Sequence, residues 1–155
     1  MPEYWAIKTT GRSDGKDYWP LFVVEGVIAI GWHEIDPGQN AGHAQRMIKM
    51  FKGIATGDHV LICRGYSGNQ KQDVYTYGFA DVKGPFVDDS ASNWWKFKHR
   101  ANIYCFVERR VQIDLLRKTL KMGSMRKTLH KIHEQEGFQQ LKSQLCKQQR
   151  ESQRG

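Results

Sequence analysis

The stretch from Val27 to Trp32 reads VIAIGW, and it is the clearest structural signal in this chain of 155 residues. Its run of apolar, mainly β-branched residues predicts a short buried strand that ends at an aromatic side chain. The sequence Asp36-Pro37-Gly38 then predicts a turn. Over residues 42–54 apolar side chains recur at helical spacing, which predicts a helix (Met47, Ile48, Met50, Phe51 and Ile54).

The same kinds of pattern predict the rest of the fold. Aromatic and β-branched residues predict strands over residues 4–9, 59–63, 74–86 and 101–112, and short helices are expected over 115–121 and 134–147. This order favours an α+β fold in which a mixed sheet of about five to six strands closes into a barrel with helices at its ends. We expect one domain over residues 1–147 and a polar, disordered tail over 148–155.

Composition narrows the class of protein. Hydrophobic residues make up 39% of the chain and aromatic residues 12%, which is enough to form a core. Cys63, Cys105 and Cys146 are odd in number and far apart, so we expect reduced cysteines and a cytoplasmic protein. No apolar run approaches the ~20 residues that span a bilayer, and the first residues lack the pattern of a signal segment. A membrane partner is therefore not expected.

Charge is unevenly distributed along the chain. Residues 1–95 hold 9 of the 24 Lys and Arg and 11 of the 16 Asp and Glu, so residues 96–155 hold the other 15 and 5. The net charge is therefore −2 in the first part and +10 in the second. A basic half suits a polyanionic partner such as nucleic acid, although a solvated helical face with a basic tail explains the charge equally well.

Four short motifs carry a resemblance to a known family. They are Tyr4-Trp5-Ala6-Ile7, Gly26 to Trp32, Gly57-Asp58-His59-Val60, and Tyr77 to Val82 (YGFADV). In this order and spacing they resemble the EVE domain over residues 3–133. The resemblance implies a PUA-like pseudo-barrel, related to the YTH readers of methylated RNA and the SRA readers of methylated DNA. It also implies that a flipped base stacks between aromatic side chains while polar groups read its edge.

The resemblance also implies where the modified-base pocket lies. It draws on the end of the first strand, the end of the second strand and a loop late in the sheet. Those places hold Lys8, Thr9 and Thr10, then Trp32, and then Trp94 and Trp95. Lys8 to Thr10 would offer amides and hydroxyls to the base edge, and Trp32 with one of the late pair would form the walls. Tyr18 and Trp19, in the first long loop, are further candidates.

Each aromatic candidate also has a purely structural interpretation. We expect Trp5 in the core, because strand-borne aromatic residues usually pack inward. Trp32 fits a barrel core as well as a pocket wall. Trp94-Trp95 cannot both face one side of an extended chain, so one of them packs and the other is available. Tyr18-Trp19 fits a hydrophobic plug as well as a base contact.

Basic and polar residues near these positions are candidates for contacts to the nucleic-acid backbone. Lysine and arginine alternate with aromatic residues after Trp94-Trp95, which is typical of a single-strand stacking platform. Any one of them also fits a side chain that simply points to solvent. The full set is Arg64, Asn69, Lys96, Lys98, His99, Arg100, Arg109, Arg126, Lys127 and Lys131.

No catalytic constellation can be assembled from the sequence, so we expect a binding module and not an enzyme. His130 and His133 lack the partners that a zinc site needs, and Asp88-Asp89 is not followed by a nuclease signature. Phosphate-cradling and nucleophile-elbow motifs are also missing. We therefore expect no metal ion and no cofactor.

The sequence thus predicts a module that reads a modified, methylated base, with DNA favoured over RNA. It would suit the specificity domain of a modification-dependent restriction system, with a nuclease or motor subunit on the same or another chain. Two alternatives stay open: a YTH-like reader of modified RNA, which needs contacts to the 2′-hydroxyl, and a protein-interaction domain that binds no nucleic acid.

Overall fold

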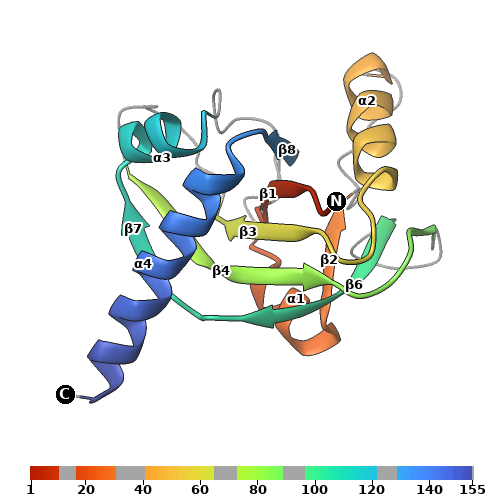
Figure 1. The fold of residues 1–155 in the computed structure, drawn as a ribbon. Coiled ribbons are helices and arrows are strands. Elements are labelled where there is room, and N and C mark those ends of the chain that lie inside the picture. The colour runs from red at the N-terminus through yellow and green to blue at the C-terminus, as the bar shows by residue number, and fades with distance from the viewer. Residues whose placement is uncertain (11–16, 31–40, 65–72, 89–96, 122–128, 155) are drawn as a thin grey trace.

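The computed structural model describes residues 1–10, 17–30, 41–64, 73–88, 97–121 and 129–154. In these ranges four helices surround a mixed, eight-stranded sheet (Figure 1). The strands are β1 (Tyr4–Lys8), β2 (Val27–Ile30), β3 (His59–Cys63), β4 (Val74–Val82), β5 (Val87–Asp88), β6 (Phe97–Tyr104), β7 (Arg109–Val111) and β8 (Leu129–Ile132). The helices are α1 (Trp19–Glu25), α2 (Ala41–Lys52), α3 (Ile113–Leu120) and α4 (Gln135–Arg154).

The main path of the sheet runs β2-β6-β4-β3-β1-β8, with β5 paired to β6 and β7 paired to β4. β1 and β3 are parallel, and the other pairs are antiparallel. In Figure 1, β2 runs steeply across the direction of β3 and β4, so the sheet curls into a half-barrel. The predicted α+β pseudo-barrel with a mixed sheet is confirmed. The number of strands was underestimated, because β5, β7 and β8 are too short to produce a sequence pattern.

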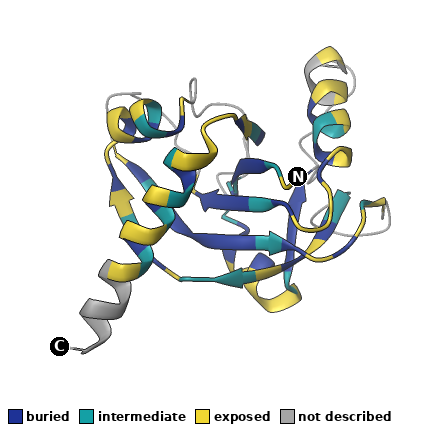
Figure 2. Cartoon of the chain, viewed as in Figure 1, coloured by how far each residue is buried: buried dark blue, intermediate teal, exposed yellow. Residues whose placement is uncertain are grey.

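The two faces of the sheet belong to two hydrophobic clusters. Alternate residues of β1 face opposite ways, because successive side chains of a strand lie on opposite sides. Trp5 and Ile7 join the cluster formed with α1, β2 and α2. Tyr4 and Ala6 join the cluster formed with α3 and α4. Since both faces are covered, most residues of β1, β3 and β4 are buried, as Figure 2 shows.

A buried carboxylate explains two of the sequence motifs. Asp58 is 2% exposed and accepts hydrogen bonds from the amide of Glu3 at 3.0 Å, the indole Nε1 of Trp5 at 3.0 Å and the amide of Ala55 at 2.9 Å. Charged acceptors make stronger hydrogen bonds than neutral ones, so Asp58 fastens the start of β1 to the start of β3. Trp5 lies in the core, as predicted.

Helix α1 replaces part of the predicted first loop. Pro20 stands in its first turn, where a missing amide hydrogen costs nothing. Gly26 ends the helix in the left-handed conformation, at φ 63°, and its amide donates to the Phe22 carbonyl. The helix has seven residues and buries only Trp19 and Phe22. A segment this short shows no clear helical periodicity, which is why the sequence pattern indicated a loop.

The strand predicted over residues 101–112 is instead two strands, β6 and β7. Cys105 and Glu108 lie between them with φ values of 55° and 41°. These left-handed conformations interrupt a strand. β6 also begins earlier than predicted, at Phe97, and β8 forms where no strand was predicted.

The last helix differs most from the prediction. α4 packs through Phe138, Leu141 and Leu145, but it continues to Arg154, into the segment expected to be a disordered tail. A disulfide joins Cys105 to Cys146, with 5.5 Å between the Cα atoms, so the expectation of three reduced cysteines is wrong. The sequence did not indicate this pair, because 41 residues separate the two cysteines. The predicted cytoplasmic location stays a prediction.

Within the described ranges, none of the helices has both the length and the apolar character needed to cross a membrane.

Candidate functional site

The ends of β1 and β3 and the start of β4 meet at a cluster centred on Asp17. Its Oδ1 accepts hydrogen bonds from the hydroxyl of Thr9 at 2.6 Å and from the amide of Trp19 at 3.0 Å. Its Oδ2 accepts the hydroxyl hydrogen of Tyr77 and lies 3.9 Å from Nε of Arg64. The Arg64 side chain is 57% exposed and that of Asp17 23%, so the cluster opens to solvent on the Arg64 side.

Aromatic rings line the inner side of the Asp17 cluster. The rings of Trp19 and Tyr77 stack face to face, with 4.7 Å between their centroids and an interplanar angle of 8°. Tyr75 meets Tyr77 edge-on at 5.2 Å, and Phe106 lies 5.9 Å from Trp19. Trp19 is nearly buried, whereas Phe106 is 40% exposed. The cluster therefore joins a buried aromatic stack to an exposed aromatic ring.

A β-bulge directs Tyr77 toward Asp17. Ile62 pairs with Gly78, but the next residue, Cys63, pairs with Thr76, which leaves Tyr77 as the extra residue of β4. Such a bulge interrupts the alternation of side chains along the strand and changes the direction in which one of them points. Tyr77 therefore faces the hydrophobic cluster formed with α1, β2 and α2, although Phe79, two residues later, faces the cluster formed with α3 and α4.

The segment after β6 holds the bulge in place. The amides of Val107 and Glu108 donate to the Tyr77 carbonyl at 3.0 and 3.4 Å, and the Tyr75 hydroxyl donates to the Glu108 carbonyl at 2.9 Å. Gly78 permits this approach, because a Cβ at that position would lie 3.0 Å from the Cys105 carbonyl oxygen. The disulfide at Cys105 thus anchors a segment that supports Tyr77.

Burial, and next the hydrogen bond to Asp17, raises the pKa of Tyr77 above its ordinary range. The phenol therefore stays protonated at neutral pH and keeps donating to the carboxylate.

The first group of predicted pocket residues is only partly available to a ligand. Thr9 is fully buried, its hydroxyl is used by Asp17, and its amide donates to the Cys63 carbonyl at 2.9 Å. This corrects the expectation that Thr9 offers these groups to a base edge. Lys8 and Thr10 are half-buried, and Thr10 forms a bridge with Asp17.

Among the aromatic candidates, Tyr18 is 1% exposed and belongs to the core, so it presents no surface to a ligand. Trp19 lies in the Asp17 cluster. Trp32, Trp94 and Trp95 lie outside the described residues. The strand ends that precede and follow their segments are adjacent, because Ile30 of β2 pairs with Phe97 of β6.

Three of the residues predicted to contact the nucleic-acid backbone lie at the Asp17 cluster or on β6. Arg64 borders the Asp17 cluster, and Lys98 and Arg100 lie on β6, half-buried and exposed respectively. Lys131 is separate: on β8 its Nζ lies 3.8 Å from Glu3 and 5.6 Å from the Trp5 ring centre. Arg109 lies half-buried on β7. Asn69, Lys96, Arg126 and Lys127 are outside the described residues.

His99 was predicted to contact the nucleic-acid backbone, and its position in the structure contradicts this prediction. It is 0% exposed, and its Nδ1 and Nε2 lie 3.0 Å and 2.8 Å from the carbonyl oxygens of Gly84 and Phe51. Both ring nitrogens are used inside the protein, so His99 cannot contact a phosphate here. On an alternating strand a histidine beside basic residues points to the opposite face from them, and this signal was available in the sequence.

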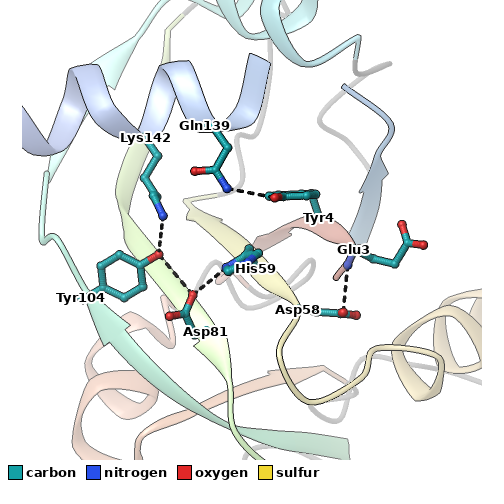
Figure 3. A network of polar contacts seen from close by, with 8 residues as sticks. All are labelled: Glu3, Tyr4, Asp58, His59, Asp81, Tyr104, Gln139 and Lys142. Carbon is teal, nitrogen blue, oxygen red and sulfur yellow. Dashed lines mark hydrogen bonds and ion pairs between the residues drawn. The ribbon is translucent and has the colours of Figure 1, made fainter. Parts of the chain in front are cut away.

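A second polar cluster lies on the other face of the sheet (Figure 3). Asp81 contacts Nδ1 of His59 at 2.8 Å and accepts from the Tyr104 hydroxyl at 3.2 Å, and Lys142 of α4 donates to that hydroxyl at 3.2 Å. Gln139 of α4 donates to the Tyr4 hydroxyl at 2.9 Å. Since two of these residues belong to α4, the second polar cluster fastens that helix to four strands.

The phenol of Tyr104 and the buried thiol of Cys63 both stay protonated at neutral pH. Burial, followed by the charge of Asp81, raises the pKa of Tyr104, so its phenol stays protonated. Burial also raises the pKa of the free thiol Cys63 to about 12, which keeps it from acting as a thiolate. Across the described ranges, the His, Cys, Asp and Glu side chains form no group of three or more that could hold a metal ion.

Sequence reasoning missed Asp17 and Tyr77, which organise the Asp17 cluster. Tyr77 stood in a motif that carried the family resemblance, but its contact with Asp17, 60 residues away, left no local pattern.

No family model and no curated protein matches the chain by sequence. Solved structures do match it. A hypothetical protein from Leishmania major has a TM-score of 0.58 at 12% identity, over 96% of this chain and 98% of that one. The DUF55 domain of human thymocyte nuclear protein 1 has a TM-score of 0.53 at 12% identity, over 92% of this chain and 98% of that one.

Two of the similar structures contain methylated nucleic acid. One is human THYN1 protein in complex with DNA containing 5-methylcytosine, with a TM-score of 0.53 at 12% identity over 92% of this chain and 97% of that one. The other is the YTH domain of the Zygosaccharomyces rouxii MRB1 protein in complex with N6-methyladenosine RNA, with a TM-score of 0.52 at 13% identity over 94% and 88%. The chain therefore has the PUA-like fold that the DUF55, or EVE, domain shares with YTH domains.

Proposed function

We propose that this chain is a nucleic-acid-binding module that recognises a methylated base, with DNA as its main partner. The observation that carries the proposal is the Asp17 cluster, which combines aromatic rings, a carboxylate and an exposed guanidinium where three strands meet. Two proteins of the same fold are described in complex with methylated DNA or RNA, which supports the same class of partner.

The chemistry of the Asp17 cluster suits a base that has been flipped out of its strand. A carboxylate has about four lone-pair sites, and Thr9, Trp19 and Tyr77 occupy three of those on Asp17. We propose that the fourth site accepts an amino or imino hydrogen of a base, beside Nε of Arg64, which lies 3.9 Å from Oδ2. Stacking of a base on an aromatic face contributes about 1–3 kcal/mol, which offsets much of the unstacking that flipping requires. The walls assigned to Trp32 and to one of Trp94 and Trp95 are part of this proposal.

Binding to matched methylated and unmethylated DNA, measured by fluorescence anisotropy, tests the proposal. We expect tighter binding to the methylated duplex and loss of that preference in Trp32→Ala. We also expect weaker binding in Arg64→Ala than in a control variant, Arg117→Ala on α3. Equal affinity for the two duplexes, unchanged by Trp32→Ala, would contradict the proposal.

RNA is the alternative partner, and the YTH complex is the observation that favours it. Competition between RNA and DNA of one sequence separates the two, because a reader of RNA gains from contacts to the 2′-hydroxyl. A nuclease or motor partner, as in a modification-dependent restriction system, is a further part of the proposal, and co-purification from the native source tests it.

A further inference from the structure

A second surface is built from three segments that His99 holds together. His99 lies on β6 and contacts the Phe51 carbonyl in the last turn of α2 and the Gly84 carbonyl after β4. The amide of Lys83 also donates to the Arg100 carbonyl at 2.7 Å. The end of α2, residues 83–86 and the first half of β6 therefore form one fixed unit.

Five basic residues lie on this unit, and Asp88 of the neighbouring β5 is an exposed carboxylate beside them. We call this unit the basic edge and define it by Lys49 and Lys52 of α2, Lys83, and Lys98 and Arg100 of β6. Lys49, Lys52, Lys83 and Arg100 are exposed. Among the described residues, no ion pair joins any of these four to a carboxylate. Their charge is therefore available to an anionic partner.

Aromatic contacts order part of the basic edge. The Nζ of Lys52 lies 5.8 Å from the ring centre of Phe86, and Phe86 stacks on Phe97 with 5.5 Å between centroids. A lysine held over an aromatic ring loses less side-chain entropy when it binds an anion than a freely rotating one does. Gly84 adds to this order, because Arg100 packs so closely against it that a Cβ there would lie 3.1 Å from the Arg100 Cβ.

The location of the basic edge fits a strand that passes the proposed pocket. Ile30 at the end of β2 pairs with Phe97 at the start of β6, and Val27 pairs with Arg100. The basic edge thus lies beside the strand ends that flank the segments carrying Trp32 and Trp94-Trp95. In Figure 1, α2 and the start of β6 are on the opposite side of the view from α3 and α4, although the far end of β6, at Tyr104, contacts Lys142 of α4. A polyanion on the basic edge would therefore not meet those two helices.

We propose that the basic edge is a phosphate-binding track for the nucleic-acid strand next to the recognised base. This inference rests on the proposed function. His99 is its positioning residue, since it touches no phosphate but fixes the segments that do. Phosphate contacts place a protein on nucleic acid without reading the base, so the basic edge contributes affinity and not the preference for methylation.

The test compares two double variants that remove the same charge from different helices. Lys49→Gln/Lys52→Gln removes it from the basic edge, and Lys118→Gln/Lys121→Gln removes it from exposed positions on or next to α3. Affinity for the methylated and unmethylated duplexes is measured by anisotropy over a series of salt concentrations. All four positions are exposed, so the variants should fold, and circular dichroism confirms this.

We expect the α2 variant to bind both duplexes more weakly by the same factor. The slope of log affinity against log salt concentration should also fall by about 1 for each lost phosphate contact, or about 2 in all. The α3 variant should keep the native slope. Equal slopes in the two variants, or a loss confined to the methylated duplex, would overturn the assignment.

The same measurements separate this inference from the proposed function. Native protein that binds without a preference for methylation, together with a reduced slope in the α2 variant, contradicts the proposed reader but supports the track. Native protein that prefers the methylated duplex, together with an unchanged slope in the α2 variant, supports the proposed reader but contradicts the track. Native protein that binds no nucleic acid overturns both.

Discussion

The hydroxyl of Tyr77 donates a hydrogen bond to Asp17, which lies 60 residues earlier in the chain. This contact depends on a β-bulge in one strand and on a carboxylate just before a short helix. It joins the part of the sheet that ends in Arg64 to the aromatic stack of Trp19. The Asp17 cluster is therefore a product of the tertiary fold, and its weakening should affect both stability and binding.

Tyr77→Phe keeps the ring stacked on Trp19 but removes the donor to Asp17. We expect the free energy of unfolding to fall by about 1 kcal/mol, the usual contribution of one hydrogen bond. Asp17→Ala leaves three donors without their acceptor, two of them on Thr9 and Trp19, and should cost about 3 kcal/mol. Urea denaturation measures both values. A larger loss for Tyr77→Phe than for Asp17→Ala would show that the carboxylate does not organise the cluster.

Gly137→Ala tests how closely α4 packs on α3. Alanine is favoured over glycine in a helix by about 1 kcal/mol, so an unconstrained site would gain stability. Here a Cβ would overlap the carbonyl oxygen of Thr119, which is backbone and cannot move aside cheaply. We expect the clash to outweigh the gain in helix propensity, so that the free energy of unfolding falls by about 1–3 kcal/mol and the Tm is lower.

The control for this prediction is Gly42→Ala in α2. A Cβ at Gly42 would make only an ordinary contact, 3.8 Å from the Arg46 side chain. That variant should be neutral or slightly stabilised. If both variants gained stability, the packing of α4 on α3 described above would be wrong.

The Cys105–Cys146 disulfide should stabilise the protein, because it restricts the unfolded chain and ties α4 to the end of β6. Cys105→Ser/Cys146→Ser should lower the free energy of unfolding by about 2–4 kcal/mol. A dithiol reductant should lower the free energy of unfolding of the native protein to that of the variant, and it should leave that of the variant unchanged. Native protein that does not respond to the reductant, and whose thiols all react after unfolding without it, would show that the bond is not formed.

Alkaline pH should destabilise the protein. Burial raises the pKa of Cys63 from 9.0 to about 12, and it raises those of Tyr77 and Tyr104 above the ordinary tyrosine range. A raised pKa in the folded state means that the folded protein holds the proton more tightly than the unfolded chain. This stabilisation is complete below the unfolded pKa and is lost as pH rises through the folded pKa.

The free energy of unfolding should therefore fall steadily as pH rises above about 9. Urea denaturation at a series of alkaline pH values measures the fall. Tyr104→Phe removes one of the groups, so its decline above pH about 10 should be shallower than that of the native protein. Tyrosinate absorbance provides a second readout, and an identical decline in the two proteins would contradict the assignment to Tyr104.

Much of the fold could be predicted from the sequence. β2, β3 and α2 lie close to where apolar runs and helical spacing predicted them, and the mixed α+β sheet follows from their order. These features depend on patterns within a few residues of each other, which reflect how each segment is buried. α1 and β8 escaped prediction because each is too short for a period to be seen.

The sequence by itself determined the buried strands β2 and β3, the apolar face of α2, that the Trp5 strand lies in the core and that basic residues gather late in the chain. Only the tertiary structure decided which distant residues meet. Asp17 reaches Tyr77 across 60 residues, Cys105 reaches Cys146 across 41, and His99 turns inward to the Phe51 carbonyl across 48. Such contacts depend on strand register, on the bulge at Tyr77 and on helix docking, and these are set by the packing of the whole sheet and not by any local pattern.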